Sequence, residues 1–340
     1  MHRCLVPILA AGGFTALLVP PAIFLAHRLG AVDHPGGRRV NTRPVPRLGG
    51  LAIFAGFMGA FFFVAPPSPA RPGFVLAGTA ALAVGLLDDL RGLKPGVKLL
   101  GQIFAAALLP CFGVAVRFIS NPWGGMIPLG PLAAPITVLW VVALMNMINL
   151  IDGLDGLAAG VSAIAALSLL FLPQCLAQPF IVLLCLLLLG CTLGFLPFNF
   201  HPARIFMGDS GAHFLGFILG YITVAGALKG RTALTFSVPF LAFAVPFADT
   251  SLAILRRWRG HRPVFRADCD HLHHRLLYLG LTHRQAVLLL YLCSGIFGAG
   301  SVFLARVAPR LGVVILLGLT ACAVGSLGGI SLGVANRNRL

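Results

Sequence analysis

The chain has 340 residues, of which 58% are hydrophobic and 10% are charged, and its mean hydropathy is +0.95. Soluble domains carry roughly 25% charged residues, so this composition excludes the soluble classes of protein and predicts an all-α, polytopic membrane bundle. The net charge is +16, from 25 Lys and Arg against nine acidic residues, all of them Asp. Because the basic residues follow a membrane topology, we expect a bilayer as the charged partner and no nucleic acid.

Apolar runs near the roughly 20 residues needed to cross a bilayer recur along the whole chain and predict about eleven transmembrane helices in one domain, 1–340. In chain order they are 5–26, 48–66, 73–87, 97–116, 131–151, 156–173, 179–198, 210–228, 233–255, 286–305 and 311–333. The loops on one side of the membrane are expected near 27–47, 88–98, 152–155, 199–209 and 256–285.

The distribution of charged residues predicts the orientation of the bundle in the membrane. These five loops and the C-terminal tail hold 18 of the 25 Lys and Arg, so the positive-inside rule places them in the cytoplasm, with the N-terminus outside and the C-terminus inside. All nine Asp fall on or near the same face, which the rule does not require. We therefore expect one polar site that faces the cytoplasm and is built from several loops.

The first candidate motif is Asp88-Asp89, which is expected to close the third helix, with Lys98 about two turns later. Two adjacent carboxylates at a membrane boundary repel each other, so a cation or a proton is expected nearby. Mg²⁺ with phosphate oxygens would neutralise them, one carboxylate could then act as a base, and Lys98 would supply a point charge for a phosphate. The alternative is a solvated helix end.

The second motif places Asn146, Asn149, Asp152 and Asp155 at every third position. On a helix or a 3₁₀ extension this spacing predicts one polar row on an apolar surface. Ligands that offer only oxygen favour Mg²⁺ over zinc. The alternative is a polar seam that joins two helices.

The third motif ends in Phe206-Met207-Gly208-Asp209-Ser210, at the start of a predicted helix. Asp209 is interpreted as a metal ligand, with the alternative that it is an N-cap. Phe206 would be exposed to stack on a base, and the helix N-terminal amides would be available to an anion.

The fourth motif is the long loop 256–285, which carries seven Arg, among them Arg259, and the cluster His271, His273 and His274. Such donors suit a diphosphate and sugar hydroxyls. A patch for lipid headgroups and a zinc site at the three His are the alternatives. Arg47, in the loop 27–47, is interpreted in the same way as Arg259.

In this order the motifs resemble those of the polyprenyl-phosphate N-acetylhexosamine-1-phosphate transferases, glycosyltransferase family 4, over nearly the whole chain. The resemblance rests on Pro46-Arg47-Leu48-Gly49-Gly50, Asp88-Asp89, Asn146 to Asp155, Phe206 to Gly211, and His271-Leu272-His273-His274. The His-x-His-His form resembles the branch that uses UDP-N-acetylglucosamine; the peptidoglycan branch has a Glu after its three His, and this chain has no Glu. Ala212-His213 departs from the family pattern and leaves the role of His213 open.

The resemblance implies a role for each matching residue. Asp209 would hold Mg²⁺, or Mn²⁺, and Asn149 can also ligate it. The nucleotide, and uracil in particular, would be contacted by Asp155 and Phe206, with Asp152 and Asn199 in the same subsite. Asp88, with Asp89 beside it, would deprotonate or orient the lipid phosphate, and Lys98 would contact a phosphate. The sugar and diphosphate would be bound by His271, His273, His274, Arg259 and Arg47.

The expected reaction is the transfer of N-acetylglucosamine 1-phosphate from UDP-N-acetylglucosamine to undecaprenyl phosphate, with release of UMP, in a bacterial inner (plasma) membrane. It would be the first membrane step of a cell-envelope glycan. Alternatives are the same reaction with another UDP-N-acetylhexosamine or with UDP-N-acetylmuramoyl-pentapeptide, and an ion-coupled secondary transporter. Homodimerisation through a lipid-facing helix is left open.

Overall fold

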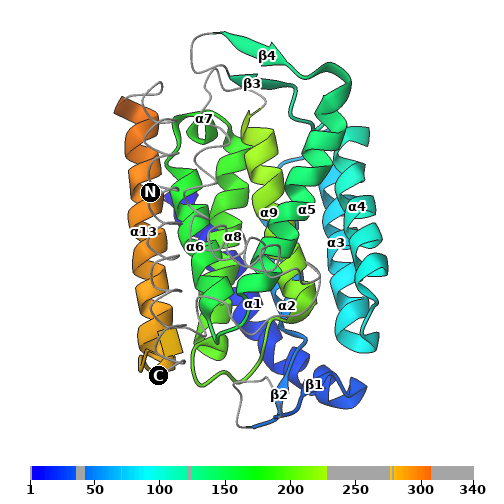
Figure 1. The fold of residues 1–340 in the computed structure, drawn as a ribbon, viewed down its shortest axis with the longest axis vertical. Coiled ribbons are helices and arrows are strands. Elements are labelled where there is room, and N and C mark those ends of the chain that lie inside the picture. The colour runs from blue at the N-terminus through cyan, green and yellow to red at the C-terminus, as the bar shows by residue number, and fades with distance from the viewer. Residues whose placement is uncertain are drawn as a thin grey trace, which may run out of the picture.

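The computed structural model describes residues 2–35, 43–69, 71–120, 125–227, 276–277 and 279–307. Over these residues the chain forms a bundle of helices that stand side by side (Figure 1). The helices are α1 (His2–Leu29), α2 (Gly49–Val64), α3 (Arg71–Arg91), α4 (Pro95–Cys111), α5 (Ala133–Ile151), α6 (Leu157–Leu170), α7 (Pro173–Leu176), α8 (Pro179–Asn199), α9 (Gly208–Ala227) and α13 (His283–Val307).

Two small antiparallel hairpins mark opposite ends of the bundle (Figure 1). At one end β1 (Val32–Asp33) pairs with β2 (Val45–Pro46). At the other end β3 (Phe118–Ser120) pairs with β4 (Met126–Pro128), followed by the 3₁₀ turn Gly130–Leu132. We call the first of these the β1–β2 end.

The predicted membrane helices are confirmed as a class. Within the described residues, five helices are long and apolar enough to cross a bilayer, namely Cys4–Leu29, Arg71–Arg91, Gly130–Ile151, Pro179–Asn199 and His283–Phe303. Shorter apolar helices lie at Gly49–Val64, Pro95–Cys111 and Leu157–Leu170. The predicted runs 233–255 and 311–333 lie outside the described residues. The chain is therefore a helical membrane protein, and its orientation and full helix count stay predictions.

Two of the predicted loops are longer than the observed ones, because polar residues at their ends belong to the neighbouring helices. The expected loop 88–98 is wrong in extent, because α3 continues to Arg91 and α4 begins at Pro95. Asp88, Asp89 and Lys98 are therefore helical. Proline suits the first position of a helix, where its missing N–H has no intrahelical partner. In the same way α8 includes Asn199 and α9 begins at Gly208, which shortens the expected loop 199–209 at both ends.

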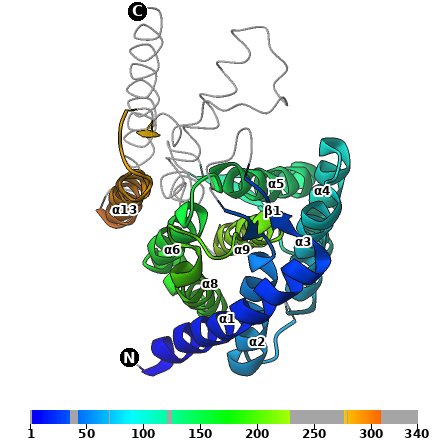
Figure 2. The same cartoon turned by 90° about the horizontal axis from the view of Figure 1, so that it is seen from below.

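The helix α9 lies at the centre of the bundle when it is viewed from the β1–β2 end, with α3, α5, α6 and α8 around it (Figure 2). Every residue from Ser210 to Gly226 is buried, as expected for a helix that is apolar on all sides. Phe74 and Tyr221 pack edge to face with ring centroids 4.9 Å apart, inside an aromatic cluster shared by α2, α3, α8 and α9. The first turn of α9 is thereby held in a fixed place among its neighbours.

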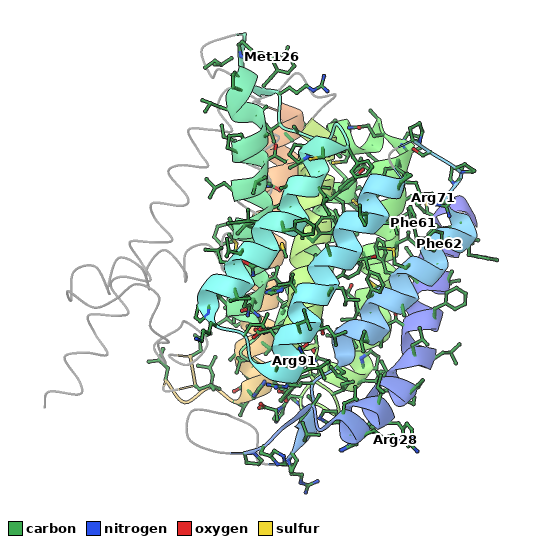
Figure 3. All side chains as sticks on the ribbon, turned by 90° about the vertical axis from the view of Figure 1, so that its right-hand side faces the viewer. Arg28, Phe61, Phe62, Arg71, Arg91 and Met126 are labelled. Carbon is green, nitrogen blue, oxygen red and sulfur yellow. The ribbon has the colours of Figure 1, made fainter. Side chains whose placement is uncertain are left out.

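Arginines lie at both ends of the outer surface, and exposed apolar side chains lie between them. Arg28 and Arg91 are at the β1–β2 end, whereas Arg71 is at the other end (Figure 3). The Arg71 guanidinium lies over the ring of Phe62, 4.7 Å from its centroid. Leu100 is 68% exposed between these ends, as a side chain that faces lipid is expected to be.

Candidate active site at the β1–β2 end

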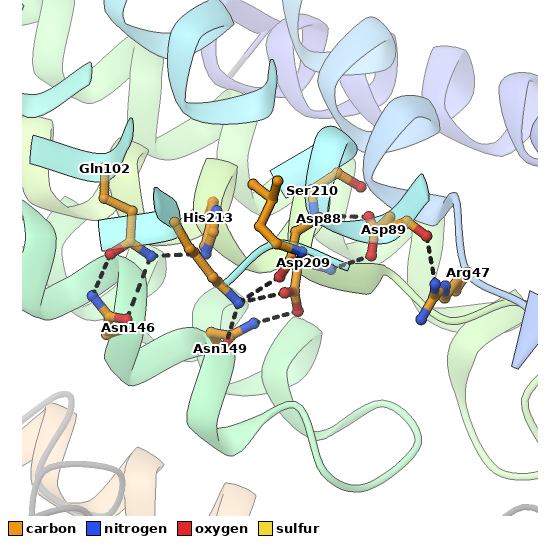
Figure 4. A network of polar contacts seen from close by, with 11 residues as sticks. Arg47, Asp88, Asp89, Gln102, Asn146, Asn149, Asp209, Ser210 and His213 are labelled. Atoms are coloured by element: carbon orange, nitrogen blue, oxygen red, sulfur yellow. Dashed lines mark hydrogen bonds and ion pairs between the residues drawn. The ribbon is translucent and has the colours of Figure 1, made fainter. Parts of the chain in front are cut away.

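Four helix ends meet at the β1–β2 end and bring their polar residues together (Figure 4). These are the last turn of α3, the first turn of α4, the last turn of α5 and the first turn of α9. All six Asp of the described residues lie at this end, on or next to these helices or in β1. The predicted clustering of the acidic residues on one face is therefore confirmed for the described part of the chain.

Lys98 is the centre of the site. Its Nζ is 2.9 Å from Asp88 Oδ2 and 3.5 Å from Asn149 Oδ1, and it donates a short hydrogen bond to Asp209 Oδ2. Asn149 Nδ2 donates to the other Asp209 oxygen at 2.6 Å. We call Asp88, Lys98, Asn149 and Asp209 the charged cluster, because its members bond mainly to one another's side chains.

Asp89 is adjacent to Asp88 in sequence but has a different environment. It is 3% exposed, and its two oxygens accept hydrogen bonds from the backbone amides of Asp209, at 2.8 Å, and Ser210, at 2.9 Å. The first amides of a helix have no partner within it, so Asp89 caps α9 from a neighbouring helix. Arg47 Nη2 donates to the Asp89 backbone oxygen at 2.5 Å. Asp89 and Arg47 thus hold the helix ends on which the charged cluster lies.

Two glycines allow this close approach of backbones. Gly208 has φ +70°, and a Cβ there would lie 2.6 Å from Asp89 Oδ2. A Cβ on Gly85, one turn before Asp89, would lie 2.4 Å from the backbone oxygen of Asp209. Any side chain at either position would push α9 away from α3. We call Arg47, Gly85, Asp89, Gly208 and Ser210 the supporting layer.

A second polar group lies deeper in the bundle and was not predicted as a unit. Gln102, four residues after Lys98 on α4, accepts a hydrogen bond from Asn146 Nδ2 at 2.7 Å. Its Nε2 is 2.9 Å from Nε2 of the buried His213. The i, i+4 spacing of Lys98 and Gln102 on an apolar helix was the available signal for Gln102. The position of His213 in this group accounts for a polar residue within the central helix.

The predicted polar row of Asn146, Asn149, Asp152 and Asp155 is only half correct. α5 ends at Ile151, and Asp152 has φ −74° and ψ 46°, so the two Asn lie on the helix and the two Asp do not. Asn146 contacts Gln102, whereas Asn149 belongs to the charged cluster. Burial raises the pKa of Asp152 well above its usual range, and the nearby Asp209, Asp89 and Asp155 raise it further. The negative charge concentrated here would be relieved by a cation.

The residues predicted to bind the nucleotide lie in the segments beside the charged cluster. Asn199 is 2% exposed; its Oδ1 accepts from Gly156 N at 3.1 Å and its Nδ2 donates to Ile205 O at 2.9 Å. Both ends of this amide are therefore used to join two loops. Phe206 is half-buried, and its backbone N–H donates to Pro46 O at 2.8 Å, which fixes its loop against β2.

Part of the predicted sugar and diphosphate site cannot be placed, because Arg259, His271, His273 and His274 lie outside the described residues. Arg47 is described, and one of its guanidinium nitrogens is committed to the α3 backbone. Its role toward a sugar nucleotide therefore stays a prediction.

The donor set of the charged cluster fits a hard cation. Carboxylate oxygens of Asp88 and Asp209 and the amide oxygen of Asn149 already surround one positive charge, the Lys98 ammonium. Oxygen ligands of this kind are those that Mg²⁺ and Mn²⁺ use. The same cluster also holds a lysine that can interact with a phosphate, so the arrangement suits chemistry on a diphosphate.

The sequence is similar to known proteins throughout this region. Residues 72–227, from α3 to α9, match the family model described as glycosyl transferase family 4. The chain is 38% identical to a probable undecaprenyl-phosphate N-acetylglucosaminyl 1-phosphate transferase of Bacillus subtilis, over 85% of this chain and 82% of that protein. It is 38% identical to a decaprenyl-phosphate N-acetylglucosaminephosphotransferase of Mycobacterium tuberculosis, over 93% and 87% of the two chains.

A more distant relative has the same kind of name. An undecaprenyl-phosphate alpha-N-acetylglucosaminyl 1-phosphate transferase of Salmonella typhi is 26% identical, over 83% of this chain and 79% of that protein. The region matched by the family model includes the whole charged cluster and the supporting layer apart from Arg47. The chain therefore belongs to glycosyl transferase family 4, as its motifs had indicated, and is a membrane-embedded transferase.

Proposed function

We propose that the protein transfers N-acetylglucosamine 1-phosphate from UDP-N-acetylglucosamine to undecaprenyl phosphate and releases UMP. The observation that carries the proposal is the charged cluster, which lies at one end of an apolar bundle where a lipid phosphate and a water-soluble nucleotide can meet. The named activities of the relatives support the donor sugar and the polyprenyl acceptor.

In the proposed reaction an oxygen of the lipid phosphate attacks the β-phosphorus of the sugar nucleotide. The bond from that phosphorus to the oxygen bridging the two phosphates breaks, and UMP leaves with that oxygen. Phosphoryl transfer of this kind depends on in-line positioning and on neutralising charge. The acceptor is already an anion near neutral pH, so at most one proton has to be removed.

The charged cluster offers groups that would position the two phosphates and neutralise their charge. Lys98 would interact with a substrate phosphate in place of the carboxylates that it contacts in the structure. Asp88, which is partly exposed beside Lys98, would accept the acceptor's proton or orient its phosphate. Asp89 is assigned a positioning role, because both of its oxygens bond to the α9 backbone.

We further propose that Asp209 and Asn149 hold Mg²⁺, with Mn²⁺ as a substitute. When bound, the ion would neutralise charge on the diphosphate as a Lewis acid. Lys98 would then release Asp209 and be free to contact a phosphate. Asp209 is well suited to this role because its backbone is fixed by Asp89, while its carboxylate accepts from the exchangeable side chains of Lys98 and Asn149.

The uracil is proposed to stack on Phe206, whose loop is fixed by its backbone bonds to Pro46 and Gly49. Asp152 and Asp155 lie on the adjoining segment after α5. Asn199 would act by holding this segment to the Phe206 loop. We also propose that the sugar and the diphosphate are contacted by Arg47, Arg259, His271, His273 and His274.

The proposed location is a bacterial plasma membrane with the β1–β2 end in the cytoplasm, at the first membrane step of a cell-envelope glycan. The basic loops support this orientation, because 18 of the 25 Lys and Arg lie on that side in the predicted topology.

The test is UMP release by the purified protein in detergent with Mg²⁺, comparing UDP-N-acetylglucosamine with UDP-N-acetylgalactosamine, with and without undecaprenyl phosphate. We expect release that depends on the lipid and favours the glucosamine donor. Lipid-independent release, or no release from either donor, would contradict the proposal. Uptake of labelled solute into proteoliposomes without UMP would favour a transporter instead.

A further inference from the structure

A second cluster of metal-ligating side chains lies at the same end of the bundle, outside the charged cluster. It consists of Asp155 in the segment after α5, His201 in the segment after α8, and His283, the first residue of α13. One ligand atom from each residue lies within 4.8 Å of the other two. His201 Nδ1 is 2.8 Å from Asp155 Oδ2, and the two imidazole rings stack with centroids 4.2 Å apart. Three segments far apart in sequence thus converge on one point.

The segment that carries Asp155 is fixed by its own hydrogen bonds. Asp155 Oδ2 accepts from the Ala203 backbone amide at 3.1 Å. The next residue, Gly156, donates its N–H to Asn199 and accepts a hydrogen bond from the Tyr291 hydroxyl at 2.5 Å. Because Tyr291 is on α13, this bond also joins the Asp155 segment to the helix that carries His283.

The position of His283 is fixed by the cap at the start of α13. Thr282 and Gln285 form a capping box, in which Thr282 N donates to Gln285 Oε1 at 2.9 Å and Gln285 N donates to Thr282 Oγ1 at 3.4 Å. Arg284 Nε donates to the His201 backbone oxygen at 3.1 Å. Backbone bonds and the α13 cap therefore hold the three candidate ligands near one another, in addition to the contact between His201 Nδ1 and Asp155 Oδ2.

His283 is the member whose polar atoms lack partners. Both of its ring nitrogens are buried and have no hydrogen-bond partner among the residues that the structure describes. Buried polar side-chain atoms are usually satisfied, and an exception calls for an unseen water, an ion or a functional role. A metal bound beside Asp155 and His201 would supply that partner.

We propose that Asp155, His201 and His283 bind a Zn²⁺ ion. Two imidazoles and one carboxylate are a common protein ligand set for zinc, with water in the fourth position. The charged cluster differs, because it offers only oxygen donors and a lysine and so suits a hard cation. The two sites would therefore select different metals although they lie at the same end of the molecule.

Zinc binding requires the ligand atoms to close in. Bonds of about 2.0–2.1 Å in a tetrahedron place neighbouring ligand atoms about 3.3 Å apart, so side-chain rotations have to shorten the largest separation, which is at most 4.8 Å. The ion would then cross-link the segments after α5 and α8 to α13. It would also engage the carboxylate of Asp155 that the family resemblance assigns to uracil, so zinc and a uridine nucleotide are expected to compete.

The test uses the full-length protein in detergent, stripped of metal and without nucleotide or lipid. Zn²⁺ is titrated against a chromophoric chelator, and Co²⁺ is added as a spectroscopic probe of tetrahedral coordination. The variants are His201→Ala and His283→Ala, and the matched control is His27→Ala, which removes an exposed His from α1 at the same end. His283→Gln replaces His283→Ala if the latter does not elute as a folded monodisperse species.

We expect the wild type and His27→Ala to share one zinc site that the other variants bind at least about 100-fold more weakly, since even outer-shell changes cost 10–100-fold. The absorption of tetrahedral Co²⁺ should also disappear in the His201 and His283 variants. Equal zinc affinity and equal Co²⁺ spectra in all proteins would overturn the proposal and leave a hydrogen-bonded Asp–His pair. Because no substrate is present, neither result bears on the transferase reaction.

Discussion

Asp88 of the charged cluster and Asp89 of the supporting layer are adjacent on α3, yet their carboxylates have different partners. Asp88 Oδ2 is 2.9 Å from Lys98 Nζ, in a group whose side chains bond mainly to side chains, while its other oxygen accepts from the Leu93 backbone amide at 2.6 Å. Asp89 is buried, and its two oxygens accept hydrogen bonds from the backbone amides of Asp209 and Ser210. A side chain that bonds to side chains can exchange its partners for a substrate, whereas one that caps a helix cannot do so without releasing that helix.

We infer that the two carboxylates of the Asp88-Asp89 motif have separate roles. One carboxylate is available for chemistry, and the other fixes the helix that carries Asp209. Substitutions in the charged cluster should therefore reduce activity and leave stability nearly unchanged. Substitutions in the supporting layer should reduce both.

The largest effect is expected for Asp209→Ala in the charged cluster. The change removes the carboxylate proposed to hold Mg²⁺ and the main partner of Lys98, so kcat for UMP release should fall by about 10³-fold or more. Thermal unfolding monitored by intrinsic fluorescence should change little, because the backbone amide of residue 209 still bonds to Asp89. Activity within tenfold of the wild type would show that the metal is held elsewhere.

Lys98→Met tests whether the Lys98 ammonium and Mg²⁺ compete for the same oxygens of the charged cluster. Without the ammonium, Asp88, Asn149 and Asp209 face no competing positive charge, so Mg²⁺ should bind the substrate-free protein about tenfold more tightly. The activity should nevertheless fall by about 10²-fold, because a phosphate contact is lost. The Mg²⁺-dependent rise in melting temperature measures the first effect. Weaker Mg²⁺ binding in this variant would contradict the proposed exchange.

Gly85→Ala tests the supporting layer without changing any polar group. The new Cβ would lie 2.4 Å from the Asp209 backbone oxygen, so α9 has to shift and stability should fall by about 1–3 kcal/mol. The activity should fall by about tenfold through the displaced Asp209. Gly96→Ala, on α4 with nothing within 4 Å of its Cβ, is the matched control. Helix propensity alone would stabilise both variants by up to about 1 kcal/mol, so an equal loss in both variants would contradict the role assigned to the Gly85 contact.

The smallest effect is expected for Tyr291→Phe, which removes one hydrogen bond to the Gly156 backbone oxygen. The cost should be about 1 kcal/mol in the free energy of unfolding, with a modest rise in KM for the sugar nucleotide and an unchanged kcat. Steady-state kinetics with varied UDP-N-acetylglucosamine measures both constants. A change in kcat alone would place this contact in the chemistry and not in loop positioning.

The helices were predictable from the sequence because membrane insertion demands long apolar runs, and those from 5–26 to 210–228 match observed helices. Their ends were not predictable to the residue. Asp88 and Asp89 were expected to end α3, but the carboxylates find partners on α4 and α9 that allow the helix to continue to Arg91. Such partners are tertiary, so a local pattern does not reveal them.

The charged cluster was predictable residue by residue, since Asp88, Lys98, Asn149 and Asp209 belong to recognisable motifs. The division of labour between Asp88 and Asp89 was not, because adjacent residues on a helix face different neighbours and only the packing shows which. The second cluster was also missed. The capping box Thr282 to Gln285 was a readable signal for the start of α13, but nothing local indicated that His283 would meet Asp155 and His201.

The most direct test of the division between the two regions is a paired measurement of Asp88→Ala and Asp89→Ala. Lipid-dependent kcat and the free energy of unfolding in the same detergent should be measured for both. We predict that Asp88→Ala loses about 10²-fold in kcat with stability near that of the wild type. Asp89→Ala should lose about 2–4 kcal/mol, because two buried amides are left without partners. Equal stability losses, or full activity in Asp88→Ala, would contradict the division.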